Sequence, residues 1–232
     1  MSLLDAVIAA GTRPPDSVPQ HQKKRDSEVL SARLAAEVAE GLRTVGFSNV
    51  RPTRDGHGER AFQGGLGPKK VDVTYADEQH GLLLAVSIKT INFAPYGKNL
   101  RNRFADLCTE AITLHMRFPY SVVCALFAFP VAADEDVTES CTVSTFRRAA
   151  KLLGTISGRE DYTGPGEKFE NVIMMLFQPV FTDGPKPWVR LHDAKTLREI
   201  TEQDYFAVLR DIYDKRNPHA AIGDEDEADD EE

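Results

Sequence analysis

The sequence predicts an α/β domain in which helices cover the faces of a mixed central β-sheet. Two continuous apolar runs, residues 121–129 and 171–181, are typical of strands that lie in the middle of a sheet and are buried on both faces. Segments with apolar residues at helical spacing separate the runs. The predicted order is helix, three strands, helix, strand, helix, strand, strand, helix, which favours this architecture.

The N-terminal quarter of the chain divides into an arm, a helix and a first strand. Residues 1–26 are rich in proline, glutamine and charge, so we expect a flexible arm with a short helix from Leu3 to Ala10. Ser27 is a good N-cap, and Gly46 stops the helix that follows. Residues 47–54 are predicted to form a strand. The glycine-rich stretch 55–68 is predicted to form turns.

A hairpin is predicted next. Residues 69–75 and 81–90 are apolar runs joined by a polar link that ends at Gly81, a pattern typical of a β-hairpin. After a loop, residues 99–117 have a helical apolar stripe and lead into the 121–129 strand.

The second half of the chain completes the sheet. We expect a helix over 142–153, the 171–181 strand and a short strand over 188–192. Thr201, with Asp204 three residues on, opens a last helix that ends before Pro218. The predicted organisation is therefore an arm (1–26), a single α/β domain (27–218) and a disordered acidic tail (219–232).

The charge of the chain is uneven. The net charge is −8, but residues 224–232 hold eight acidic groups and no basic one. Subtracting these eight from the 36 acidic residues leaves 28, equal to the 28 lysines and arginines. A neutral body can still carry a basic face, so the overall charge does not exclude a nucleic-acid partner.

Several function classes are not favoured. No apolar run approaches the roughly 20 residues that span a bilayer, so no membrane association is expected. The N-terminus lacks a basic leader, and three cysteines without a Cys-x-x-Cys pair indicate free thiols in a cytoplasmic protein. The histidines form no metal-binding pattern, and no phosphate-binding glycine loop ends in Gly-Lys-Ser/Thr.

Lys89 is the residue of the hairpin that requires an explanation. It lies near the end of an otherwise apolar strand, on the same face as Ser87. An isolated buried charge is costly, so Lys89 needs a carboxylate or a reacting anion nearby. Asp72 on the neighbouring strand is the candidate partner, and a structural ion pair of Asp72 with Lys70 or Lys89 is one open interpretation.

Asp72, the Ser87-Ile88-Lys89 stretch and Glu37 on the preceding helix occur in an order that resembles the PD-(D/E)xK nuclease superfamily. The resemblance implies a restriction-endonuclease-like fold and a Mg²⁺- or Mn²⁺-dependent DNA endonuclease. Asp72 and the Ile88 carbonyl would be metal ligands. Lys89 would orient the attacking water and offset developing charge, and Glu37 would hold a metal-bound water.

The resemblance also implies a nucleic-acid surface. Phosphate contacts would come from basic side chains around the motif: Lys69, Lys70, Lys98, Arg101 and Arg103. Arg147, Arg148 and Lys151 form another basic group, which is either a solvated surface or a nucleic-acid contact. The size of the chain fits a prokaryotic restriction or anti-phage defence role. By analogy we expect a homodimer or a partner subunit, since cutting two strands needs two sites.

Ser87 departs from the family pattern, which has Glu, Asp or Gln two residues before the lysine. A hydroxyl is a weaker, neutral ligand. Three outcomes stay open: a functional variant, a carboxylate supplied from elsewhere (Glu37, Glu59 or Asp77), or a domain that no longer cuts. The alternative function is accordingly a catalytically inactive nuclease-like domain that serves as a nucleic-acid-binding or assembly subunit.

Overall fold

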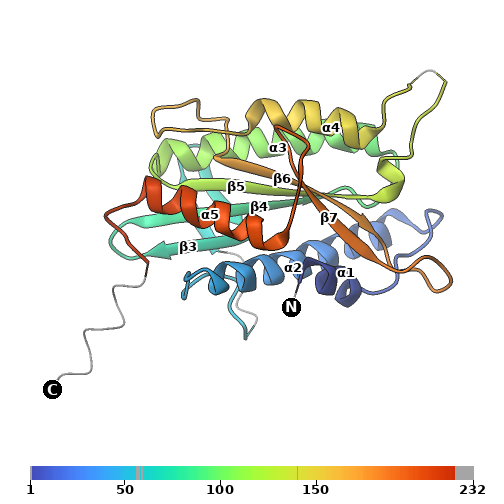
Figure 1. The fold of residues 1–232 in the computed structure, drawn as a ribbon, viewed down its shortest axis with the longest axis horizontal. Coiled ribbons are helices and arrows are strands. Elements are labelled where there is room, and N and C mark those ends of the chain that lie inside the picture. Colours follow the sequence, from blue (N-terminus) through green and yellow to red (C-terminus); the bar gives the residue numbers. More distant parts are fainter. Residues whose placement is uncertain (1, 56–57, 59, 140, 223–232) are drawn as a thin grey trace.

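The computed structural model describes residues 2–55, 58, 60–139 and 141–222, and its centre is a mixed sheet (Figure 1). The strand order is β3-β4-β5-β6-β7-β8. β4, β5 and β6 are parallel, and the remaining neighbours are antiparallel. The strands are β3 (Val73–Asp77), β4 (Gly81–Thr90), β5 (Val122–Pro130), β6 (Asn171–Gln178), β7 (Trp188–Asp193) and β8 (Glu199–Ile200). The predicted α/β class with a mixed sheet is confirmed.

Helices cover both faces of this sheet (Figure 1). One apolar core joins the sheet to α1 (Leu3–Ala10), α2 (Gln20–Thr44) and α5 (Glu202–Arg216). The other joins it to α3 (Tyr96–Arg117) and α4 (Thr145–Leu153). Two short 3-10 turns, η1 (Val131–Ala133) and η2 (Gly154–Ile156), follow β5 and α4. Alternate residues of β5 contribute to opposite cores, as the pleat of a doubly covered strand requires.

The two continuous apolar runs are the central strands. Every residue of β5 and of β6 is buried, so the interpretation of these runs as two-sided strands is confirmed. The last helix is also as predicted, because Thr201 and Asp204 form a capping box at the start of α5.

The region before β3 differs from the prediction. No strand lies at residues 47–54, where Arg51 makes only an isolated bridge to Thr74. Pro52 has no backbone N–H to continue a ladder there. The predicted turn region instead contains a hairpin of its own, with β1 (Arg60–Gly64) antiparallel to β2 (Gly67–Val71). β3 and β4 form the predicted hairpin, but residues 69–71 belong to β2.

The prediction of a mobile N-terminal arm is wrong. The helix from Leu3 to Ala10 is present, but its apolar residues are buried in the core. α2 begins at Gln20, and the Ser27 hydroxyl donates to the Lys23 carbonyl within the helix instead of capping it. The predicted acidic tail lies outside the described residues from 223 onward. Before that point, the Tyr213 hydroxyl donates to the Ala220 carbonyl at 2.8 Å.

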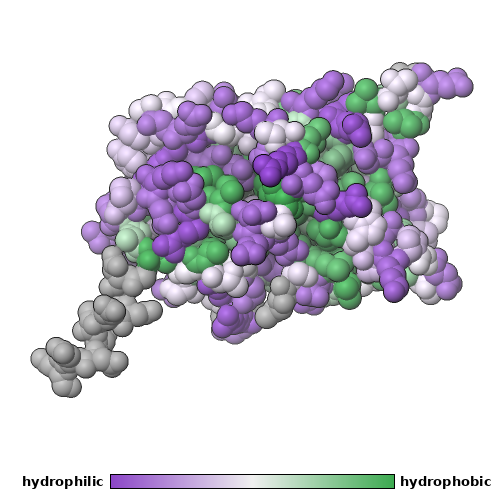
Figure 2. Space-filling model, in the orientation of Figure 1, coloured by the Kyte–Doolittle hydropathy of each residue, from purple (hydrophilic) through white to green (hydrophobic). Residues whose placement is uncertain are grey.

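Figure 2 shows a mainly hydrophilic face with apolar side chains between polar ones. Within the described ranges, no helix has the length and apolar character needed to traverse a bilayer. Cys108, Cys124 and Cys141, all of them described, are free thiols as expected.

Candidate functional site

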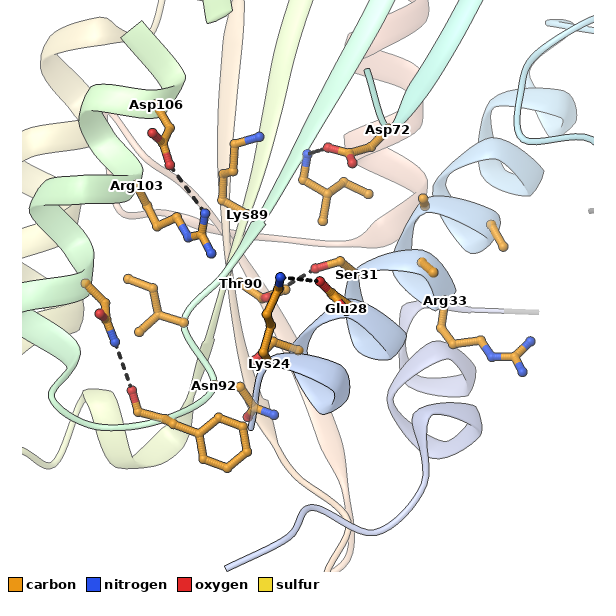
Figure 3. A pocket seen from close by; sticks show the side chains of 18 of the residues that line it. Lys24, Glu28, Ser31, Arg33, Asp72, Lys89, Thr90, Asn92, Arg103 and Asp106 are labelled. Atoms are coloured by element: carbon orange, nitrogen blue, oxygen red, sulfur yellow. Dashed lines mark hydrogen bonds and ion pairs between the residues drawn. The ribbon is translucent and has the colours of Figure 1, made fainter. Parts of the chain in front are cut away.

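A large cleft lies between α2, the end of β4 and the start of α3. Its volume is about 1370 Å³, above the usual size of a small-molecule pocket, so a segment of a larger ligand would fit it. Figure 3 shows α3 with Arg103 and Asp106 on one side and α2 with Lys24 and Ser31 on the other. Asp72 and Lys89 both contribute to its lining.

Asp72 lies in the break between β2 and β3, beside the edge of β4. Its Oδ2 accepts a hydrogen bond from the Ile88 backbone N–H at 2.6 Å. Both backbone groups of a strand residue point to the same edge of the strand, so the Ile88 carbonyl also points toward this edge. The structure therefore brings a carboxylate and a backbone carbonyl to one side of the cleft, the two groups that the resemblance assigns to a metal.

The ion-pair partner of Lys89 is Glu110, so the predicted pairing of Lys89 with Asp72 is wrong. Lys89 Nζ lies 3.0 Å from Glu110 Oε2, and Lys69 Nζ approaches the same oxygen at 3.0 Å. The hydroxyl of Ser87 donates to the other oxygen, Oε1. Lys69, Ser87, Lys89 and Glu110 thus form one polar cluster, which we call the Glu110 cluster, between β2, β4 and α3.

Glu110 is 1% exposed, so its charge depends on these partners. Burial alone would raise the pKa of the carboxyl, but Lys89, the Ser87 hydroxyl and Lys69 outweigh it and hold the pKa below its usual value. The Lys89 side chain remains 15% exposed toward the cleft. Glu110 therefore fixes the position of Lys89 from behind.

Glu110 was not among the predicted site residues. It supplies a carboxylate next to Ser87, where the family pattern has an acid, but it comes from α3 and not from β4. A signal was available, because Leu107 and Leu114 lie three residues before and four residues after it. These spacings place Glu110 on the buried stripe of α3, where an acid needs a partner.

The other carboxylates proposed for this position lie differently. Glu37 is half-buried on α2 and lines the cleft. Burial raises its pKa, and Asp5, Glu40 and Glu202 add to the rise. Asp77, at the opposite end of β3 from Asp72, binds the His80 ring at 2.8 Å and does not supply the carboxylate at Ser87. Glu59 lies outside the described residues.

The predicted basic residues divide among three places. Lys98 and Arg103 line the cleft, where Arg103 lies 3.3 Å from Asp106. Lys69 belongs to the Glu110 cluster, whereas the exposed Lys70 points to the other side of β2. Arg101 lines a separate, smaller cavity against α4. Lys24, which was not predicted, reaches the cleft from α2.

Polar contacts attach α2 and the segment before it to the end of β4. Ser31 Oγ and Thr90 Oγ1 are 3.1 Å apart, and the Asn92 side-chain amide donates to Asp26 at 2.5 Å. The Arg13 guanidinium donates to the Asn92 carbonyl. These contacts fix the α2 wall of the cleft within a few residues of Lys89.

The residues present fit a hard cation in donor type. The Asp72 carboxylate and the Ile88 carbonyl are oxygen donors, and Mg²⁺ commonly takes one or two carboxylates with water and substrate phosphate completing its shell. Both oxygens of Glu110 are engaged by Ser87 and by the two lysines. In the parts of the chain that the structure describes, no three His, Cys, Asp or Glu side chains are grouped as a metal site.

Comparisons of the chain with protein-family models, with curated proteins and with solved structures return no match. The site is therefore interpreted from its own geometry, as a cleft with a carboxylate, a carbonyl and a lysine that is fixed by a buried acid.

Proposed function

We propose that this protein is a divalent-metal-dependent DNA endonuclease that hydrolyses phosphodiester bonds. The observation that supports the proposal best is the lysine of the cleft. Lys89 lines the same cleft as Asp72 and Ile88. The buried carboxylate of Glu110 forms an ion pair with Lys89 and fixes it there. A structural ion pair between Asp72 and Lys89 does not explain this arrangement, because Lys89 is paired with Glu110.

Each group of the cleft has a role that follows from its chemistry. Asp72 and the Ile88 carbonyl would hold Mg²⁺ or Mn²⁺, which supplies Lewis acidity and a polarised water. Lys89 donates hydrogen bonds to an oxygen of the phosphate or to the attacking water and offsets the charge that develops there. Glu110 binds Lys89, and Ser87 binds Glu110. Both lie behind Lys89 and are therefore positioning residues.

The walls of the cleft suit a polyanion. Arg103 on α3 and Lys24 on α2 lie on opposite walls, paired with Asp106 and Glu28, and Lys98 also lines the cleft. Phosphate contacts of this kind are blind to base sequence and supply much of the affinity of DNA-binding proteins. A setting in prokaryotic restriction or anti-phage defence, with a second copy or a partner subunit for the second strand, is part of the proposal.

Cleavage of supercoiled plasmid DNA tests the proposal. Wild type is expected to nick or linearise the plasmid with Mg²⁺ or Mn²⁺ and not with EDTA, whereas Asp72→Ala and Lys89→Ala lose this activity. Lys215→Ala is the matched control, because Lys215 is an exposed lysine on α5 paired with Asp211. Equal cutting by all four proteins would contradict the proposal.

A second candidate function is a non-catalytic nucleic-acid-binding or assembly subunit. The observation that favours it is that Glu110, the acid beside Ser87, has both oxygens engaged by protein groups. This candidate predicts salt-dependent DNA binding by wild type with no cutting under any divalent cation. Metal-dependent cutting that Lys89→Ala abolishes would exclude it.

A further inference from the structure

A second basic cavity lies between the start of α3 and α4, which run side by side (Figure 1). Its volume is about 340 Å³, and its charged lining residues are all basic: Arg101 from α3, and Arg148 and Lys151 from α4. The other lining residues are apolar or neutral. This cavity is separate from the cleft of Asp72 and Lys89.

The charges of this cavity are only partly compensated. Among the residues that the structure describes, no carboxylate lies within 4.0 Å of the charged groups of Arg101 or Lys151. Arg148 donates to Thr145 Oγ1 at 2.6 Å and lies 4.0 Å from Asp136. Three cations that share a small cavity repel one another, so an anion placed between them would be stabilised.

The cavity and the cleft are neighbours, with the first turn of α3 between them. Gly97 lines the cavity, and the next residue, Lys98, lines the cleft. The Arg148 guanidinium lies directly over Gly97, where an added Cβ would be 3.2 Å from Arg148 Nη2. A basic path therefore runs from Lys98 across this turn to Arg148 and beyond it to Lys151.

We infer that the cavity between α3 and α4 binds phosphates of the DNA backbone beyond the segment that occupies the cleft. The inference rests on the proposed function for its partner. It assigns a second contact site, made by Arg101, Arg148 and Lys151, to the same DNA. A duplex that is too short to leave the cleft would not reach this site, whereas a longer one would.

Equilibrium binding in EDTA tests the inference, because no cleavage is expected there. Two labelled duplexes, of about 8 and about 24 base pairs at 3.4 Å each, are titrated over a range of NaCl concentrations. The Arg101→Gln/Lys151→Gln double variant removes two of the contacts. The Arg147→Gln variant is the matched control, since Arg147 is on α4, is 69% exposed and lies 3.8 Å from Asp134.

On the long duplex, the slope of log K against log salt should become shallower by about 0.9 for each lost contact, or about 1.8 for the double variant. On the short duplex the double variant should bind like wild type. Binding of the double variant to the long duplex with the slope of Arg147→Gln would overturn the inference. If wild type binds neither duplex, the inference is overturned as well.

Cleavage of plasmid DNA, measured on the same wild-type sample, separates the two proposals. Binding that weakens in the double variant, without any cutting by wild type, would support the second contact site and contradict the endonuclease. Metal-dependent cutting by wild type, with binding unaffected in the double variant, would support the endonuclease and contradict the second contact site.

Discussion

Replacing Glu110 by Gln removes the only negative charge of the Glu110 cluster and leaves its two ammonium groups together. Breaking a buried ion pair by removing one partner costs about 3–5 kcal/mol. The Lys89 and Lys69 side chains are 15% and 31% exposed, so water relieves part of their repulsion. We therefore expect the lower end of that range, about 3 kcal/mol. A glutamine can still accept the hydrogen bond from Ser87.

Thermal unfolding measures this loss. For a chain of this size, 1 kcal/mol corresponds to about 2–4 °C in Tm, so Glu110→Gln should melt about 6–12 °C below wild type at pH 7. Asp106→Asn is the matched control. It lies one turn earlier on α3, its side chain is 53% exposed, and it pairs only with Arg103 among the described residues. Its loss should stay within about 0.5 kcal/mol.

A double-mutant cycle tests whether Lys89 is the cause. Lys89→Met removes one of the stranded cations, so adding it to Glu110→Gln should cost less than the sum of the two single changes, by about 0.5–3 kcal/mol. Additivity of the two changes, or a Tm for Glu110→Gln within 1 °C of the Asp106→Asn control, would refute this account of the cluster.

The contribution of Glu110 should also depend on pH. Its pKa in the folded protein is below the ordinary value of 4.5, because Lys89, Ser87 and Lys69 outweigh the effect of burial. A depressed carboxyl pKa stabilises the fold at pH values above 4.5, and this stabilisation is lost as the pH falls through the folded-state pKa. The Tm difference between wild type and Glu110→Gln should hold above pH 4.5 and shrink below it. A difference that grows in acid would contradict the depressed pKa.

Three further changes have definite expected outcomes. Glu170→Gln should lower the free energy of unfolding, measured in urea, by about 3–5 kcal/mol. The reason is that this buried carboxylate accepts hydrogen bonds from Arg159 and Arg216 at 2.9 Å each. A loss under about 1 kcal/mol would show that the network is dispensable. Thr201→Ala removes the capping box of α5 and should cost about 0.5–2 kcal/mol in the same assay, with Thr201→Ser retaining most of it. Asp72→Asn should bind DNA more tightly than wild type in EDTA, and unchanged or weaker binding would count against the cleft as the DNA site.

The sheet could be predicted from the sequence because its central strands β5 and β6 are mostly apolar. β5 and β6 are buried on both faces, so most of their residues are apolar. The N-terminal 26 residues gave a wrong prediction, because what orders them is remote in sequence. Arg13 and Asp26 bind Asn92, which lies 79 and 66 residues away, and composition carries no sign of such contacts.

Only part of the candidate site could be predicted, because here too one contact joins residues that are remote in sequence. Asp72 and Lys89 stand out because charges on apolar strands require partners. The identity of the partner could not be obtained from strand pairing, since Glu110 lies 21 residues after Lys89 on a helix. Asp72 lies in the break between β2 and β3, where its carboxylate binds the Ile88 N–H at the β4 edge, whereas Lys89 on β4 binds Glu110.

The charges of the site explain why a metal belongs to the proposed reaction. Lys69 and Lys89 carry two positive charges, and Glu110 and Asp72 carry two negative ones, so these four groups sum to zero. A DNA phosphate added to them leaves a net negative charge, which a divalent cation would reverse. Asp72→Asn removes this net negative charge without a metal. Asp72 is half-buried, and removing one unfavourable charge contact at such a site is worth about 0.2–1 kcal/mol, so DNA affinity in EDTA should rise by up to about fivefold. The same variant should lose cleavage, and this opposite response of binding and cutting would not arise from a merely structural role for Asp72.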